Sequence, residues 1–263
     1  MQSYVQNVYH SSDPLHKNPH YHDCHQIILV VKGKIDLCVN DRAFTAKAGS
    51  AMIFSRYENH SVFGGTSEYE RYVLHIDPDI VKQKSSIYSL LTDRPAGFCN
   101  VIDVSASMRA LTELFEHIIF EHNYASKLSD EMEQLLLKQL LITLYRCTPV
   151  NFEIAYDDVI MSIKRLFENG YREQLSLDKL SKQYSISVSS LTHRFKSATG
   201  MSVMDYLQSC RMANAKQMLA ETDYMIGEIV EKCGFSDNSN FSRTFKALTG
   251  MSPSDFRKKY KAY

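Results

Sequence analysis

The sequence predicts an α+β protein of two domains. An N-terminal β-barrel with a following helix pair precedes an all-α C-terminal domain, in which a long helix joins two helix-turn-helix units. The chain has 263 residues, enough for two cores. Short apolar runs between Gly, Asn and Asp turns change near residue 106 to a helical period, and a segment between residues 177 and 260 occurs twice. We expect domains at 1–147 and 157–263 with a linker at 148–156.

The first domain begins with a polar segment, residues 1–18, that we expect to be a loose arm. Short apolar runs then follow, with Gly33 in the first turn and Asn40-Asp41 in the next. The expected strands are 25–31, 35–39, 43–46, 51–55 and 69–76. Many short strands separated by turn residues are typical of an antiparallel barrel or sandwich.

Two helices are expected next, at 106–123 and 129–146, with Ser129 and Asp130 as capping candidates for the second. The apolar positions of the second helix are Met132, Leu135, Leu136, Leu140, Leu141 and Leu144. A helix packed only on a barrel needs an apolar stripe of roughly 100°, and this face is wider. The excess indicates either a second contact surface, such as a dimer interface, or burial between domains. Pro149 then marks the linker.

The C-terminal domain begins with a helix at 157–169. Residues 192–202 recur at 242–252, an offset of 50, whereas the upstream apolar positions recur at an offset of 49. The units therefore span about 177–200 and 226–250, with one extra residue in the second turn. A long helix at 202–220 joins them. Gly200 is expected to end the second helix of the first unit in a left-handed conformation.

The second helix of each unit combines a buried stripe with a polar face. We expect Val188, Leu191, Phe195 and Ala198 to be buried in the first copy, and Phe241, Phe245 and Leu248 in the second. Ser187 is the expected N-cap of the first of these helices, and Ser202 and Ser252 begin capping boxes with acidic residues three positions on.

Short polar groups and cations occupy the opposite faces, which suits a helix in a DNA major groove. The candidate DNA-contacting residues are Ser189, Ser190, Thr192, His193, Arg194 and Lys196 in the first copy, and Asn238, Ser239, Asn240, Ser242, Arg243 and Lys246 in the second. We expect Lys196 and Lys246 to contact phosphates and the others to contact base edges. A helical repeat that only packs on itself is the alternative.

Charge and cysteine usage limit the class of protein. Formal net charge is zero, but residues 160–263 hold 16 Lys/Arg against 10 Asp/Glu. This moderate surplus predicts salt-dependent DNA binding that does not rest on charge alone. The six cysteines lie far apart, in a spacing that fits neither a disulfide framework nor a zinc cassette. With no leader-like start and no apolar run of about 20 residues, we expect a reduced, cytoplasmic protein without a membrane span.

Residues 160–260 resemble the DNA-binding domain of the AraC/XylS family of bacterial transcription regulators. The most specific motifs are 234–246, 249–253 and 256–257, together with a linker-helix pattern at Arg211, Ala215 and Leu219. The resemblance implies a transcription regulator, either an activator or a repressor, that binds promoter DNA as a homodimer through the 129–146 helix, with RNA polymerase as a further partner. His193 departs from the family pattern, where arginine is usual, and Arg194 stands next to it.

Within the first domain, His20, His22, Gln26 and Gly33 resemble the first cupin motif, and Gly49 with His60 the second. Metal-binding cupins have glutamate where this chain has Gln26, and a neutral amide is a poorer metal ligand. Three interpretations of the histidines remain open: polar groups of an effector pocket, structural histidines, or a metal site in which the neighbouring His25 could substitute for one of them. Our prediction is a pocket without a metal or another cofactor.

The pocket is expected to hold a small-molecule effector, and the family resemblance suggests a carbohydrate. The expected contacts are His20, His22, Gln26, His60, Tyr57 and Arg71. Two rival classes remain, a metal-dependent cupin enzyme with an accessory helical domain and a helical adaptor that binds protein. Because no catalytic constellation rises above chance spacing, we expect a regulator and not an enzyme.

Overall fold

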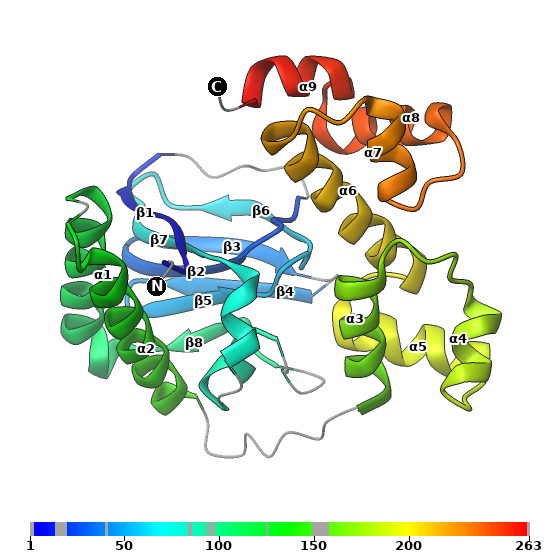
Figure 1. Cartoon of the computed structure of the whole chain (residues 1–263). Helices are drawn as coiled ribbons and strands as arrows, with labels where there is room; N and C mark the ends of the chain where they lie inside the picture. The colour runs from blue at the N-terminus through cyan, green and yellow to red at the C-terminus, as the bar shows by residue number, and fades with distance from the viewer. Residues whose placement is uncertain are drawn as a thin grey trace. The chain divides into compact units, whose positions relative to one another are not determined.

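The computed structural model describes residues 3–13, 20–39, 42–83, 86–92, 94, 98–124, 126–148 and 158–261 (Figure 1). Its contacts divide the chain into two compact units, the first comprising residues 1–156 and 197–200 and the second residues 157–196 and 201–263. Nearly all of the expected linker lies outside the described residues, as does the expected turn at Asn40-Asp41. Among the described residues, no helix has the length and apolar character needed to cross a membrane.

The described strands of the first unit form two antiparallel sheets (Figure 1). One has five strands in the order β1 (Val5–Ser11), β7 (Glu70–Ile76), β2 (His25–Lys32), β5 (Ser50–Phe54) and β8 (Val101–Asp103). The other has three in the order β4 (Arg42–Lys47), β3 (Lys34–Val39) and β6 (His60–Gly65). The predicted barrel or sandwich is thus a pair of facing sheets.

Strand β2 is apolar without interruption from residue 27 to residue 31 because it lies between two cores. Ile28 and Val30 belong to a core shared with Ile35 and Leu37 of the second sheet. Ile27 and Leu29 point the other way, into a core shared with the helices that follow the strands. Both faces of the central strand are therefore buried, so the alternation of a half-exposed strand is absent.

The turn from β2 to β3 requires glycine. Gly33 has φ of +80°, and a Cβ atom there would lie 1.9 Å from the carbonyl oxygen of Glu68. A larger residue would displace the segment before β7 and disturb the pairing of the two sheets.

The expectation of a loose arm at residues 1–18 is wrong for residues 5–11. They form β1, which pairs with β7, and Val5 and Val8 are buried. The polar residues between them point outward, and a register shift between Val5 and Asn7 breaks the strict alternation that would have identified the strand.

Helices α1 (Met108–Asn123) and α2 (Ser129–Cys147) pack against each other and against the five-stranded sheet. Ser129 is not the N-cap, because helix α2 begins with this residue and Leu128 occupies the capping position. The Ser129 hydroxyl instead donates to the Glu121 carboxylate at 2.9 Å, so it joins the two helices.

The second unit is helical throughout its described residues. Its elements are α3 (Asp158–Gly170), α4 (Leu177–Gln183), α5 (Val188–Thr199), α6 (Val203–Glu221), α7 (Ile226–Lys232), α8 (Asn238–Thr249) and α9 (Pro253–Tyr260). Ser202 and Ser252 cap α6 and α9 as expected, each accepting the backbone N–H of the aspartate three residues on.

The buried stripes of the two recognition helices end differently from the prediction. Ala198 is exposed and Leu248 is 44% exposed, whereas Thr199 is buried. In each recognition helix the inward side chain of the last turn is a threonine, Thr199 in the first copy and Thr249 in the second. A threonine hydroxyl can form hydrogen bonds with nearby backbone groups. Thr249 donates to the carbonyl of Phe245 at 2.8 Å and accepts the N–H of Met251 at 3.3 Å.

Candidate DNA-binding surface and effector pocket

The two helix-turn-helix units have matching dimensions. Helices α4 and α7 have seven residues each, and α5 and α8 have twelve. Four residues separate α4 from α5 and five separate α7 from α8, which is the extra residue expected in the second turn. The sharp bend depends in both copies on a left-handed residue at the same place, Ser185 with φ 54° and Gly234 with φ 77°.

Both recognition helices start with a side-chain cap that leaves their polar faces open. Ser187 accepts the N–H of Ser190 at 3.1 Å, as predicted, and Asp237 accepts the N–H of Asn240 at 2.6 Å. The exposed candidates are Ser189, His193, Lys196, Asn238, Ser239, Asn240, Arg243 and Lys246. The half-buried candidates are Ser190, Thr192, Arg194 and Ser242. The exposed groups supply donors and acceptors for bases and two cations for phosphates.

Some candidates are partly occupied by contacts within the protein. The Thr192 hydroxyl lies 3.0 Å from the carbonyl oxygens of both Val188 and Ser189, one turn back in its own helix. Arg194 is half-buried and interacts with other groups of the protein. His193 is exposed and is therefore the more accessible of these two adjacent candidates. In the second copy, Arg243 donates to the Asn240 side chain at 3.3 Å, which orients both groups on one face.

Helix α6 and the segment before α4 connect the two helix-turn-helix units. Arg211 of α6 donates to the carbonyl oxygens of Tyr171 and Glu173, both at 2.8 Å, and its guanidinium lies over the Phe235 ring. Gln174 donates to the carbonyl oxygen of Gly234 at 3.2 Å, in the turn of the second unit. The segment 171–174 therefore joins α3 of the first half to the second turn, a function that sequence analysis missed.

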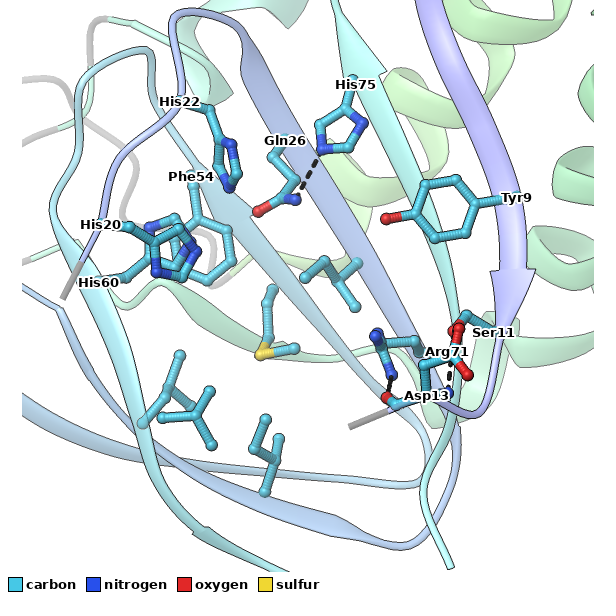
Figure 2. A pocket seen from close by; sticks show the side chains of 15 residues that line it. Tyr9, Ser11, Asp13, His20, His22, Gln26, Phe54, His60, Arg71 and His75 are labelled. Carbon is cyan, nitrogen blue, oxygen red and sulfur yellow. Dashed lines mark hydrogen bonds between the residues drawn. The ribbon is translucent and has the colours of Figure 1, made fainter. Parts of the chain in front are cut away.

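A cavity of about 310 Å³ lies between the two sheets of the first unit (Figure 2). Its lining residues are Tyr9, Ser11, Asp13, His20, His22, Gln26, Ile28, Ile35, Leu37, Met52, Phe54, His60, Val62, Arg71 and His75. Figure 2 shows polar side chains at two ends, the histidines with Gln26 at one and Arg71 with Ser11 and Asp13 at the other. Apolar side chains lie between them, an arrangement typical of small-molecule sites.

Strand pairing brings the histidine end together. His20 and His60 exchange two backbone hydrogen bonds of 3.0 and 2.9 Å, and the two imidazole ring centres lie 4.4 Å apart. His60 also stacks on Phe54 with ring centres 4.2 Å apart. Burial lowers the pKa of His60 to about 4, and burial also lowers the pKa of His75. Both rings are therefore neutral near pH 7, and Gln26 lies 2.8 Å from a nitrogen of His75.

The same geometry fits three nitrogen donors around a metal ion. One ligand atom from each of His20, His22 and His60 lies within 4.8 Å of the others. The His60 Nδ1 atom is 3.0 Å from the carbonyl oxygen of Glu58, so its Nε2 atom is the one left for a ligand. Imidazole suits zinc, copper, nickel and iron, but Gln26 supplies no negative charge. The histidines could hold a metal, and the amide weakens that fit.

Five of the six expected effector contacts line the cavity: His20, His22, Gln26, His60 and Arg71. Tyr57 does not line it; the side chain is 1% exposed and packs under the Arg56 guanidinium. His25 also lies away from the cavity, where its Nδ1 accepts the N–H of Arg56 at 3.1 Å.

Tyr9, Ser11, Asp13 and His75 also line the cavity, and sequence analysis missed all four. His75 could have been found, because Arg71 and His75 are four residues apart in one strand and so share a face. The other three lie in or next to β1, where the sequence predicts a loose arm.

A ligand cavity and two helix-turn-helix units define a class of DNA-binding proteins that respond to small molecules. The family model for an AraC-like ligand-binding domain matches residues 6–144, and a helix-turn-helix domain model matches 180–259. The chain therefore belongs to the AraC/XylS family. It is a transcription regulator with a DNA-binding and a ligand-binding domain.

Curated relatives are also transcription regulators, and solved structures share the fold of this chain. The transcriptional activator RhaS of Salmonella paratyphi A is 25% identical over 243 residues, covering 90% of this chain and 86% of its own. RhaS of Salmonella schwarzengrund is 23% identical over 245 residues, with the same coverage. ToxT of Vibrio cholerae has the same fold, with a TM-score of 0.57 at 14% identity over 99% of this chain and all of its own. A fatty-acid-bound ToxT structure superposes with a TM-score of 0.54 at 14% identity over 95% and 93%.

Proposed function

We propose that this regulator binds two half-sites on one face of DNA and that a small molecule in the cavity controls this binding. The 157–263 domain is assigned to DNA and the 1–147 domain to the effector and to dimerisation. The duplicated polar faces of α5 and α8 support the proposal most directly. Helix α6 has 19 residues, about 28 Å at 1.5 Å per residue, close to the roughly 34 Å of one DNA turn.

The base contacts are assigned by exposure and hydrogen-bonding capacity. Arg243 and Asn240 of α8 are the principal base-contacting pair, with Asn238, Ser239 and Ser242 beside them. In α5 His193 is assigned to a base ahead of the half-buried Arg194, together with Ser189, Ser190 and Thr192. Lys196 and Lys246, one turn further along each helix, are assigned to phosphates. The polar face of α8 is the richer one, so the second half-site is expected to be the more stringent.

We further infer a homodimer through the exposed face of α2. Leu137, Leu140, Leu141 and Leu144 are buried in the N-terminal unit, but Leu135 is 62% and Met132 44% exposed. Phe120 and Tyr124 of the adjacent α1 are also exposed. An apolar patch of this kind on two packed helices fits a self-complementary interface.

Activation through RNA polymerase and a cytoplasmic location complete the proposal, and catalysis is not part of it. A metal-dependent cupin enzyme is the second candidate, favoured by the cluster of His20, His22 and His60. Metal analysis of purified protein separates the two. A stoichiometric metal that is lost in His22→Ala would favour the enzyme, and protein that binds its operator without metal would favour the regulator.

The direct test is a footprint of the purified protein on the DNA upstream of its own gene. We expect two protected half-sites about one helical turn apart, with affinity that changes when an effector is added. A protein that binds all DNA fragments equally would contradict sequence-specific regulation.

A further inference from the structure

The cavity contains a buried cation whose partners are incomplete. Arg71 is 4% exposed, and its Nη1 atom donates to the backbone carbonyl of Asp13 at 2.7 Å. Its Nε atom is buried without a hydrogen-bond partner. Within the described part of the chain, no Asp or Glu side-chain oxygen lies within 4.0 Å of this guanidinium. Arg71 therefore lines the pocket as a buried charge without an ion pair (Figure 2).

Arg94, a second arginine of the same domain whose side chain is buried away from the cavity, has an ion-pair partner. Its side chain is 7% exposed and pairs with the Glu58 carboxylate, which is 11% exposed. It also donates to the carbonyl oxygen of Ile53 at 3.0 Å. Burying a charge is costly unless it is paired, and at Arg94 the protein supplies the carboxylate itself. Among the described residues no carboxylate pairs with Arg71, and its side chain lines the cavity instead.

The acidic residue that lines the cavity does not supply this carboxylate. Asp13 also lines the cavity, but it is exposed, so water screens its charge. One of its carboxylate oxygens accepts the Ser11 hydroxyl at 3.3 Å, and its contact with Arg71 is through the backbone. The guanidinium therefore retains donors for a planar anion, and carboxylates match this geometry well.

The polar groups at the opposite end of the cavity can form hydrogen bonds with hydroxyl groups of a ligand. The Gln26 Oε1 atom is buried without a hydrogen-bond partner, while the Gln26 amide nitrogen lies 2.8 Å from His75. His20, His22 and His60 surround this end. A hydroxyl can donate to Gln26 and accept from, or donate to, an imidazole. A purely aliphatic tail would leave the Gln26 oxygen unsatisfied, and a neutral sugar would leave Arg71 without an anion.

We propose that the effector is a hydroxylated carboxylate of about monosaccharide size, such as a uronic or aldonic acid. Its carboxylate pairs with Arg71, and its hydroxyls bind Gln26 and the histidines. This inference rests on the proposed function of the cavity as an effector site. The volume of about 310 Å³ is near the lower end of small-molecule pockets, which suits a compact polar ligand.

The test compares matched acids and neutral molecules on the full-length protein. Thermal shift and calorimetry are measured with D-glucuronate, D-galacturonate and D-gluconate, with D-glucose and D-galactose as neutral counterparts and octanoate as an aliphatic acid. We expect at least one hydroxylated acid to raise the melting temperature progressively with concentration. The neutral sugars and octanoate should have no effect. A neutral sugar or octanoate that binds as well as the best acid, or a panel in which no hydroxylated acid binds, would overturn the proposal.

Variants locate the binding energy. Arg71→Gln should weaken the acid at least tenfold, and Arg71→Lys should lose less because it keeps the charge without the fork. Gln26→Leu should also weaken the acid, whereas Arg42→Gln, at an exposed arginine of β4, should not. Unchanged acid affinity in Arg71→Gln would refute the pairing. The acid-versus-neutral comparison on the unaltered protein decides the question if Arg71→Gln fails to fold.

A gel shift on the upstream DNA separates this inference from the proposed function. Regulation of DNA binding by a neutral ligand would leave the regulator intact and refute the acidic effector. Binding of an acid through Arg71 with no effect on DNA affinity would retain the ligand class and refute control by the cavity.

Discussion

At the residue scale, Arg243 and Lys246 separate base recognition from phosphate binding. Both are exposed on α8, one turn apart. We expect Arg243→Ala to cost about 1–3 kcal/mol and to relax preference at one base pair, because a guanidinium contacts a base edge bidentately. Lys246→Ala should weaken all sequences alike and reduce the salt slope by about 1. Binding to a set of single-base operator variants measures both, and base-selective loss in Lys246→Ala would contradict the assignment.

The two turns give a matched pair for stability. Ser185 has φ 54° and its counterpart Gly234 has φ 77°. Ser185→Gly should stabilise the C-terminal unit by up to about 1 kcal/mol, because a left-handed conformation is strained for residues with a Cβ.

Gly234→Ala should destabilise the same unit more strongly, since the new Cβ atom would lie 2.7 Å from the carbonyl oxygen of Arg172. Urea unfolding of both variants measures the two free energies. Equal and small effects would show that the turns do not constrain the units.

His60 predicts the acid sensitivity of the N-terminal unit. Burial holds the pKa of His60 at about 4 in the folded state, against 6.5 ordinarily. The unfolded chain therefore binds more protons than the folded one between these values, so stability falls as pH drops from about 6.5 to about 4. His60→Gln should flatten this part of the stability–pH curve, whereas His117→Gln, at an exposed histidine, should not. Identical slopes for the unaltered protein, His60→Gln and His117→Gln would show that His60 does not cause the acid sensitivity.

Local chemistry explains which residues were predictable. The caps at Ser187, Ser202 and Ser252, the glycine ends and the duplicated polar faces are short-range signals, and they lie where the sequence predicts them, whereas the predicted cap at Ser129 is wrong. The sequence predicts that Tyr57 faces the pocket, but it is buried beneath Arg56 and against the ring of Tyr21, a contact distant in sequence that the local pattern does not record. Asp13 was missed for the same reason, since only pairing of β1 with β7 brings it to Arg71.

At the element scale, helix α2 tests the proposed dimer. Leu135 and Met132 are exposed beside a buried row of leucines, so a charge at Leu135 should disrupt an interface without disturbing the fold. We expect Leu135→Asp to convert a dimer to a monomer, measured by analytical ultracentrifugation. Ser67→Asp, at an exposed site in the segment between β6 and β7, is the control. A dimer that survives Leu135→Asp would place the interface elsewhere.

Helices were predicted to within a residue or two, and strands less well. The predicted 157–169 and 129–146 correspond to α3 (Asp158–Gly170) and α2 (Ser129–Cys147). Strands β1, β6 and β8 were missed. Strand β8 has three residues, and β6 contains two glycines, so neither shows a clear alternation. Strands of this kind are defined by their partners, which the local sequence does not record.

At the scale of the whole molecule, a chain of zero formal net charge concentrates its positive surplus in the DNA-binding half. The surplus is small, so specific contacts from both recognition helices must contribute to affinity. Arg211 and Gln174 connect the two helix-turn-helix units, which limits how far they can move apart within the C-terminal unit. The separation of the half-sites is then a property of the protein and not only of the DNA.

The central claim is that one chain inserts both recognition helices into successive major grooves, and half-site spacing tests it most directly. Affinity is measured for the natural operator and for operators with about 5 base pairs inserted between the half-sites, which rotates one by half a turn. We expect affinity to fall to that of a single half-site, and Arg243→Ala to have no further effect if the second half-site is the one lost. Unchanged affinity at the altered spacing would contradict it.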